Sequence, residues 1–269
     1  MPQEKPLEIK ALIADKQFLS GNSRLSESIE DYPEGIIIPI DKPYRWTSAD
    51  VIRKVKWAAC RHFHKKNLKV GHAGTLDPLA TGVLILCTGK CTKQIETLQA
   101  HTKEYEATLQ LGATTPSYDM EHEVNETFAT AHITEDAIRE ALPQFVGDIQ
   151  QTPPTFSACK IDGKRAYSMR REGQDVVLKP KNIHIDSIEI TRFAPDTMQL
   201  DLRIVCGKGT YIRALARDLG RALGSGAYLT QLRRTRVGEY DIDKCIEYDH
   251  FQEWLDNQEI ETSNETVTV

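Results

Sequence analysis

The residue with the clearest chemical potential is Asp77, in the stretch Gly71–Leu86, which reads GHAGTLDPLATGVLIL. A glycine-rich approach precedes it, and an apolar run, Val83–Leu86, follows it. A carboxylate between two such segments is expected to face a crevice, where carboxylates often do chemistry. A structural role is also open, because aspartate is a favoured helix N-cap and Pro78 suits the first helical position. Taken alone, the stretch favours the cap.

Aromatic and basic residues elsewhere could serve the same chemistry. Tyr105 lies in KEYEATLQLG, which alternates like a strand with one wet face. Tyr211 and Arg213 lie in VCGKGTYIRALARDLG, at a glycine-rich junction between a predicted strand and a predicted helix. Such a junction offers backbone N–H groups and a helix dipole to an anion such as phosphate. Considered one at a time, such residues are more often ordinary aromatic residues of a strand or helix, or surface arginines. Only their occurrence together supports a functional site.

Charge is segregated along the chain, although the net charge is only −5. Residues 51–70 hold seven basic residues and no acid, and residues 203–236 hold eight basic residues and one acid, Asp218. The residues after Tyr240 are strongly acidic. A basic middle on an acidic average suggests a local patch for a polyanion. Either basic block alone would also suit a solvated helix face.

Several classes of protein are disfavoured by composition. No apolar run approaches the length of a membrane span, and the N-terminus lacks the apolar core of a secretion signal. The six cysteines are scattered, which suits reduced thiols of a cytoplasmic protein, and Cys87 and Cys91 lack the spacing of a CxxC pair. The segment CRHFH, Cys60–His64, is read as basic surface and not as a metal site. We therefore expect no metal and no cofactor.

The elements that must position these residues come as adjacent strands with helices between them. Strands are expected in GIIIPIDKP, VLILCTG, KEYEATLQLG, NIHIDSIEITRF and MQLDLRIVC, and helices after Thr47, in CTKQIETLQ, after Thr134 and in GTYIRALARDLGRALG. This order predicts an α+β fold with a mixed, largely antiparallel sheet and flanking helices. Residues 1–34 are expected to form a loosely structured N-terminal extension, residues 35–240 the main domain, and residues 241–269 an acidic tail.

Three motifs in this order resemble the TruB-type tRNA pseudouridine synthases: GHAGTLDPLATGVL, QTPPTFSACKIDGKRAY and GKGTYIRALARDLG. The resemblance runs from Asp41 to Gly238, which is most of the chain. It implies the pseudouridine synthase fold, with a central RNA-binding cleft, and a cofactor-free isomerase (an intramolecular transferase). Such an enzyme flips a uridine out of the T loop of tRNA, detaches the uracil, rotates it and rejoins it through carbon.

The resemblance also assigns roles to residues. Asp77 matches the catalytic aspartate, and Arg213 matches the arginine that pairs with it, holds it ionised and aims it. Tyr105 matches the aromatic that stacks on the target base and is implicated in proton transfer. The predicted substrate-binding residues are His72, which wedges into the RNA loop, Tyr211 and Leu232, which line the pocket, Lys42, Lys160 and Lys208, which contact phosphates, and Asp119, which lies near the pocket.

The sequence departs from the family pattern at a few places. Arg45 and His122 stand where the family often has glycine, and Pro116 stands where it often has an acid. Only 269 − 238 = 31 residues follow Gly238, so no C-terminal RNA-binding domain of the PUA type is expected. They include a short amphipathic piece around Phe251, Trp254 and Leu255.

The expected partner is the tRNA T stem-loop, without a membrane, and the expected state is a monomer. Other readings are another structured RNA as substrate, an RNA-folding module whose catalysis is incidental, or an unrelated α+β protein with a capped turn at Asp77.

Overall fold

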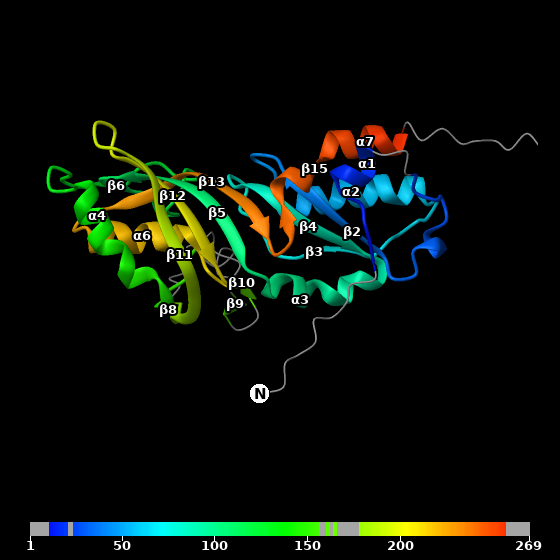
Figure 1. Cartoon of the computed structure of the whole chain (residues 1–269), viewed down its shortest axis with the longest axis horizontal. Coiled ribbons are helices and arrows are strands. Elements are labelled where there is room, and N and C mark those ends of the chain that lie inside the picture. Colours follow the sequence, from blue (N-terminus) through cyan, green and yellow to red (C-terminus); the bar gives the residue numbers. More distant parts are fainter. Residues whose placement is uncertain (1–10, 21–23, 157–159, 162–163, 166–177, 257–269) are drawn as a thin grey trace, which may run out of the picture.

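One mixed sheet runs along the long axis of the molecule (Figure 1). The computed structural model describes residues 11–20, 24–156, 160–161, 164–165 and 178–256. Within these residues the sheet has 11 strands, whose main path is β1 (Leu12–Ile13), β2 (Ile36–Lys42), β4 (Thr81–Thr88), β13 (Ala227–Val237), β5 (Lys103–Leu111), β12 (Gln199–Cys206), β11 (Lys181–Ala194) and β8 (Gly147–Gln151). Three short strands pair beside this path: β3 (Val70–His72) with β4, β14 (Tyr240–Asp241) with β13, and β15 (Ile246–Glu247) with β2. Most pairs are antiparallel, as predicted, and β1–β2, β15–β2 and β4–β13 are parallel.

Helices cover the sheet at both ends of the molecule (Figure 1). The helix α2 (Ser48–His62) begins at a capping box, in which the Thr47 side chain accepts from the Asp50 backbone N–H and Asp50 accepts from that of Thr47. Such a cap contributes about 1 kcal/mol to helix stability. The remaining described helical segments are α1 (Lys16–Ser20), α3 (Ile95–Ala100), α4 (Glu135–Ala141), α6 (Ile212–Ala222), α7 (Tyr248–Asp256) and the 3-10 turns η1 (Ile29–Asp31), η2 (Gly89–Gln94), η3 (Leu142–Phe145) and η4 (Ile242–Lys244). Two small hairpins, β6 (Ala113–Thr114) with β7 (Glu126–Thr127) and β9 (Lys160–Ile161) with β10 (Lys164–Arg165), lie outside the main sheet.

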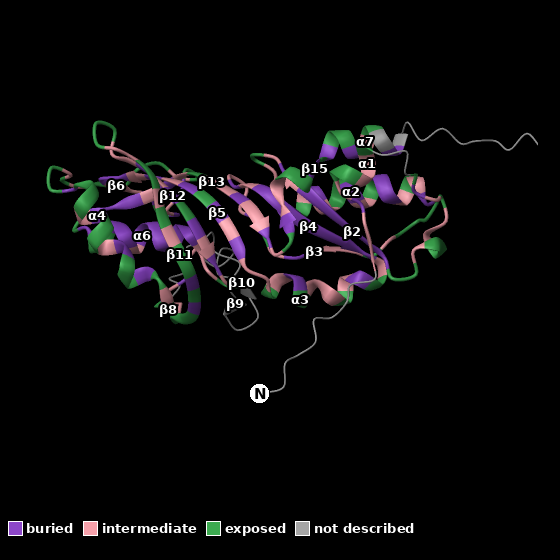
Figure 2. Ribbon diagram, viewed as in Figure 1, coloured by how far each residue is buried: buried purple, intermediate pink, exposed green. Residues whose placement is uncertain are grey.

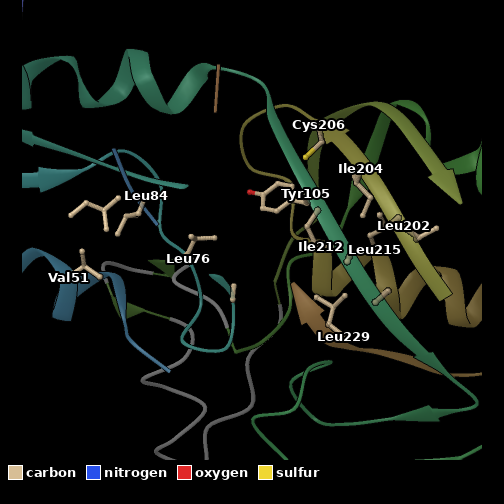
Figure 3. Packing of buried hydrophobic residues seen from close by; sticks show 14 of the residues in the cluster. Val51, Leu76, Leu84, Tyr105, Leu202, Ile204, Cys206, Ile212, Leu215 and Leu229 are labelled. Carbon is tan, nitrogen blue, oxygen red and sulfur yellow. The ribbon is translucent and has the colours of Figure 1, made fainter. Parts of the chain in front are cut away.

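The helix α6 is almost entirely buried (Figure 2). Its residues Ile212, Leu215 and Leu219 belong to the same core cluster as Tyr105 and Leu109 of β5. The strand β5 alternates between buried and less buried side chains, so one of its faces supplies this core. In Figure 3 the Tyr105 ring points from β5 toward the side of the molecule that holds Leu76. Burial therefore aims a tyrosine at the loop that carries Asp77.

The strands β4 and β13 meet in a short parallel seam, where Arg233 pairs with Thr81 and Arg234 with Gly82. Gly82 has a φ of 103°, and a Cβ atom there would lie 2.1 Å from the Arg234 carbonyl oxygen. Only glycine permits this approach. Because the loop with Asp77 leads directly into β4, this seam sets where the Asp77 backbone sits.

The described part of the N-terminal segment, residues 11–20 and 24–34, takes part in the fold. We expected residues 1–34 to be loosely structured, but β1 pairs in parallel with β2 through Leu12 and Ile13. Ala14 and Leu25 are buried in the same core as β2. A two-residue strand without strong alternation leaves no recognisable pattern in a sequence, because its pairing depends on an edge that another segment supplies.

The acidic C-terminal segment also joins the fold. The strand β15 pairs with β2 at Ile40 and Asp41, beyond the residues that pair with β1. The amphipathic piece predicted around Phe251 is the helix α7, and Phe251 and Leu255 are buried in the main core. Two short strands from opposite ends of the chain thus cover an otherwise open strand edge. Among the described helices, none is long and apolar enough to cross a membrane.

Candidate active site

The loop that carries Asp77 is a single turn and does not begin a helix. The Ala80 N–H donates to the Asp77 carbonyl oxygen at 3.1 Å, and β4 follows at Thr81. Two backbone groups just before the turn are fixed by Ser48, whose hydroxyl accepts from the Leu76 N–H at 2.9 Å and donates to the Leu76 carbonyl at 3.1 Å. Asp77 thus begins a short turn, as the structural interpretation expected, but it does so through its backbone carbonyl and begins no helix, while its carboxylate points elsewhere.

That carboxylate lies against Arg213 of α6, as the resemblance predicted. The Arg213 Nε is 2.8 Å from Oδ2 of Asp77 and 3.5 Å from Oδ2 of Asp119. The N–H at Nε meets neither oxygen in hydrogen-bond geometry, so these contacts are ionic. The Arg213 side chain is 6% exposed, whereas the Asp77 side chain is 39% exposed. A buried guanidinium thus faces a half-open carboxylate, and catalytic contacts of this kind often align fully only when substrate is bound.

A tight loop anchors Arg213 from the other side. The Arg213 Nη1 donates to the Ser117 carbonyl oxygen at 3.2 Å. The Ser117 hydroxyl donates to Oδ1 of Asp119 at 2.5 Å, and the Glu121 N–H donates to the same oxygen at 3.0 Å. Between them Tyr118 has a φ of 59°, a left-handed conformation that costs a non-glycine residue of order 1 kcal/mol. The strained residue turns the Ser117 carbonyl and the Asp119 carboxylate toward the same arginine.

Tyr105 is held by a second buried arginine, Arg234. Tyr105 and Arg234 lie directly opposite each other in the pairing of β5 with β13, so their side chains project from the same face of the sheet. Burial raises the pKa of the Tyr105 hydroxyl, and the neighbouring Arg234 cation acts in the opposite direction. The Arg234 guanidinium also donates to the carbonyls of Val83 at 2.8 Å and Gly74 at 3.1 Å. Arg234 therefore joins the tyrosine to both ends of the Asp77 loop.

These residues surround one cavity of about 300 Å³. Six of the residues predicted from the sequence line it: Asp77, Tyr105, Lys208, Tyr211, Arg213 and Leu232. The side chain of Gln151 fixes the start of α6, because it accepts from the Tyr211 N–H at 2.9 Å and donates to the Tyr211 carbonyl at 3.2 Å. Asp119 is buried and shares an adjoining small pocket with Asp77, Arg213 and Leu232. The Asp119 carboxylate contacts Arg213 but does not line the larger cavity.

Lys42 differs from the prediction of a phosphate contact. Its side chain is fully buried, and its ammonium donates to the carbonyls of Pro43 at 2.8 Å, Trp46 at 2.6 Å and Pro78 at 3.3 Å. Burial lowers the pKa of Lys42 to about 8, against the opposing effect of the nearby Asp77 and Asp41 carboxylates. The Lys42 ammonium has no exposed surface that an RNA phosphate could contact. Its hydrogen bond to the Pro78 carbonyl supports the Asp77 turn instead.

Of the two other predicted substrate contacts, His72 is described and Lys160 is described only in its backbone. His72 ends β3, opposite Leu86 of β4, and is half-buried. The backbone of Lys160 belongs to β9, and its side chain lies outside the described part of the structure. His72 is not among the described residues that line the cavity with Asp77.

Sequence reasoning missed Arg234, Lys103, Ser48 and Ser117. Lys103 is buried at the cavity, and its ammonium contacts the carbonyls of Gln99 and His101 at the end of α3. Burial lowers its pKa to about 8. The double arginine in LTQLRRTRVGEY was visible, but Arg234 is recognisable as a site residue only once β13 is paired with β5. In the described residues, no group of histidine, cysteine, aspartate or glutamate side chains could hold a metal ion.

The chain was compared with known protein families and curated proteins. Residues 61–212 match the N-terminal domain of the TruB family pseudouridylate synthase, and residues 213–267 match the C-terminal domain of tRNA pseudouridylate synthase B. The chain is 57% identical over 231 residues to the tRNA pseudouridine synthase B of Phocaeicola vulgatus, covering 86% of this chain and 97% of the relative. It is 55% identical over 237 residues to that of Bacteroides thetaiotaomicron, covering 87% and 99%.

Solved structures give the same fold. A crystal structure of a Cbf5–Nop10–Gar1 complex contains a chain that is 26% identical, with a TM-score of 0.59, covering 93% of this chain and 65% of that chain. The structure of an H/ACA RNP bound to a substrate RNA containing 2′-deoxyuridine contains one that is also 26% identical, with a TM-score of 0.59, covering 85% and 57%. This chain thus spans a little over half to two thirds of these structural relatives.

Proposed function

Because the chain belongs to the TruB family of pseudouridylate synthases, we propose that the Asp77 carboxylate performs the central step of its reaction. The protein is a tRNA pseudouridine synthase, an isomerase. The carbon–nitrogen bond between uracil and ribose breaks, and a carbon–carbon bond replaces it. A carboxylate serves this exchange as a nucleophile or proton acceptor at the sugar or base.

The observation that carries the proposal is the asymmetric exposure of the ion pair. Asp77 is 39% exposed toward the cavity, whereas Arg213, 2.8 Å away, is 6% exposed. The arginine is anchored by the Ser117 carbonyl and the Asp119 carboxylate. One carboxylate oxygen is thereby held in place while the group stays open to a substrate, which is the preorganisation that such chemistry requires.

The residues that line the cavity suit a nucleotide base that has been flipped out of the RNA stack. We assign Tyr105 as the stacking and proton-transfer residue, with Tyr211 and Leu232 as the other walls of the base pocket. An enzyme that acts on a base inside a folded loop must extrude it, and stacking surfaces offset the lost base stacking. His72 is assigned as the wedge that occupies the vacated place in the RNA loop.

The bound RNA is proposed to be the tRNA T stem-loop, held by a monomeric protein in the cytoplasm. Lys208 supports this assignment, because it is exposed at the mouth of the cavity, between Gly207 and Gly209. Lys160 is assigned a phosphate contact as well. Lysines placed in this way position an RNA backbone without reading its bases.

A single-turnover assay on an unmodified tRNA T stem-loop tests the function. Wild type should convert one uridine, and Asp77→Asn should bind the RNA equally but not react. Glu135→Gln is the matched control, because Glu135 is also paired with an arginine, Arg139, on the helix α4, and it lines neither pocket that contains Asp77. If Asp77→Asn reacts at the wild-type rate, the catalytic assignment is wrong. If wild type binds but does not react, the T loop is not the substrate.

A further inference from the structure

His122 contacts the arginine–carboxylate network through Ser117. It is half-buried, and its Nδ1 lies 3.0 Å from the Ser117 hydroxyl oxygen. Its ring packs against Phe156, with ring centroids 4.8 Å apart and planes inclined by 47°. The imidazole is therefore held from both sides, by an aromatic ring and by a polar contact.

The hydrogen bonds of Ser117 determine which atom is the donor in its contact with His122. The Ser117 hydroxyl has one hydrogen, which it donates to Oδ1 of Asp119 at 2.5 Å. A carboxylate can only accept, so this hydrogen is not available to His122. The Ser117 oxygen must then accept from the imidazole, and His122 carries a hydrogen on Nδ1. The result is a directed chain from His122 through Ser117 to Asp119.

Ser117 contacts the arginine–carboxylate network through its hydroxyl, which His122 constrains, and through its backbone carbonyl. Its hydroxyl sets Asp119, whose other oxygen lies 3.5 Å from the Arg213 Nε, and its carbonyl accepts from the Arg213 Nη1 at 3.2 Å. Ser117 is fully buried, so no solvent replaces a lost partner. A change in the Ser117 rotamer therefore removes the hydrogen bond to Asp119 and, with it, one of the two contacts that aim Arg213 at Asp77.

We propose that His122 is a positioning residue for the isomerisation, which fixes the Ser117 hydroxyl and through it the Asp119–Arg213–Asp77 array. The inference rests on the proposed function of Asp77. It requires the Nδ1–H donor of His122, and it does not require the imidazole to contact RNA.

Two substitutions separate the donor from the ring. His122→Asn keeps an N–H donor at the same distance from the backbone but loses the ring. His122→Phe keeps a ring against Phe156 but loses the donor. We expect His122→Phe to slow single-turnover conversion roughly three- to tenfold, the effect of losing one buried hydrogen bond, with unchanged affinity for the T stem-loop. His122→Asn should stay within about twofold of wild type, a difference smaller than one neutral hydrogen bond.

A double-mutant cycle tests the route through Ser117. Ser117→Ala should slow the reaction at least as much as His122→Phe, and the double variant should be no slower than Ser117→Ala alone. Additive effects would show that His122 acts independently of Ser117 and would overturn the proposal. So would a slow His122→Asn beside a normal His122→Phe, which would mean that the ring is what matters.

Melting temperatures and RNA affinity of each variant exclude a merely structural effect. A variant that slows conversion only in proportion to lost folded protein counts against the proposal. The failure of this inference is distinct from that of the proposed function. An inactive Asp77→Asn with a fully active His122→Phe removes only the role of His122, whereas an active Asp77→Asn removes both.

Discussion

Arg213 is the side chain on which the chemistry of the site converges. It is buried on α6 and has two carboxylates, Asp77 and Asp119, within 3.5 Å of its Nε. Taking an arginine out of water is costly unless its charge is matched, so the second carboxylate and the Ser117 carbonyl stabilise it where it is needed. The half-open Asp77 then has a fixed partner but retains access to the cavity.

A substitution at Tyr105 distinguishes its role in base stacking from its role in proton transfer. Tyr105→Phe keeps the ring in place but removes the hydroxyl, on which the nearby Arg234 cation acts. We expect RNA binding to be unchanged and single-turnover conversion to fall at least about 100-fold, the lower range for loss of a proton-transfer group. The measurement is the rate of pseudouridine formation at saturating enzyme. A rate near that of wild type would restrict Tyr105 to stacking.

Between elements, Glu104 ties three strands together on the face of β5 opposite Tyr105. Its carboxylate contacts Arg203 of β12 through Nε at 3.0 Å and Nη2 at 3.1 Å, and Arg236 of β13 at 3.0 Å. The Arg203 hydrogen bond is the largest cause that lowers the Glu104 pKa, and the Arg236 hydrogen bond adds to it. The strands that carry Tyr105 and Arg234 are thus joined behind the site by an ion-pair network.

This network predicts how stability depends on pH. The folded-state pKa of Glu104 lies below its ordinary value of 4.5, so the unfolded chain takes up the proton first as pH falls. The stabilisation is complete above the unfolded pKa and is lost as pH falls through the folded pKa. We expect Glu104→Gln to lower the free energy of unfolding by about 1–3 kcal/mol at pH 7 and to flatten its acid dependence.

Denaturant unfolding of both proteins at pH 7 and at acid pH measures this effect. Glu106→Gln, two residues along the same strand face and exposed, is the matched control. Parallel acid profiles for wild type and Glu104→Gln would contradict the prediction.

Across the whole molecule, both ends of the chain complete one edge of the sheet. The strands β1 and β15 pair with different parts of β2, and α7 buries Phe251 in the core. The loop that follows β2 contacts the Asp77 turn, because the Arg45 N–H donates to the Pro78 carbonyl at 2.8 Å. Arg45 has a φ of 67°, a left-handed conformation that glycine adopts more readily than any other residue.

The C-terminal helix should therefore contribute to global stability. Phe251→Ala removes a side chain that is 1% exposed, and we expect it to lower the free energy of unfolding by about 3–5 kcal/mol. Glu253→Ala, an exposed position on the same helix, should change it by less than about 0.5 kcal/mol. Urea unfolding curves measure both. Equal stability of the two variants would mean that α7 is a detachable tail.

The positive charge of Lys208, which lines the cavity, should contribute to binding of the whole RNA. If Lys208 contacts an RNA phosphate, Lys208→Ala should reduce the slope of log affinity against log salt by about 0.7–1. Lys90→Ala is the control, since Lys90 is exposed but paired with Glu34 at 3.3 Å. Fluorescence titration of a labelled T stem-loop at several salt concentrations gives both slopes. Equal slopes would remove Lys208 from the RNA interface.

The sequence by itself determined the type of fold and the centre of the site. Alternation in segments such as KEYEATLQLG predicts strands because each face of a sheet meets one environment. The motifs around Asp77 and Arg213, with QTPPTFSACKIDGKRAY between them, indicated the family, and the structure brings Asp77, Tyr105 and Arg213 to one cavity. These features can be recognised in a sequence because each depends on residues that are close together in the chain: the hydrophobic period of a strand, the residues of a motif and the spacing within it.

Only the tertiary structure decided which polar residues are buried and what they hold. Lys42 and Lys208 are both lysines beside small or turn-forming residues, yet one is fully buried against three carbonyls and the other is exposed. Ser117 and Arg234 gain their roles from partners far away in the chain. The burial of a charge and the identity of its partners depend on long-range packing, and no local pattern of residues encodes that packing.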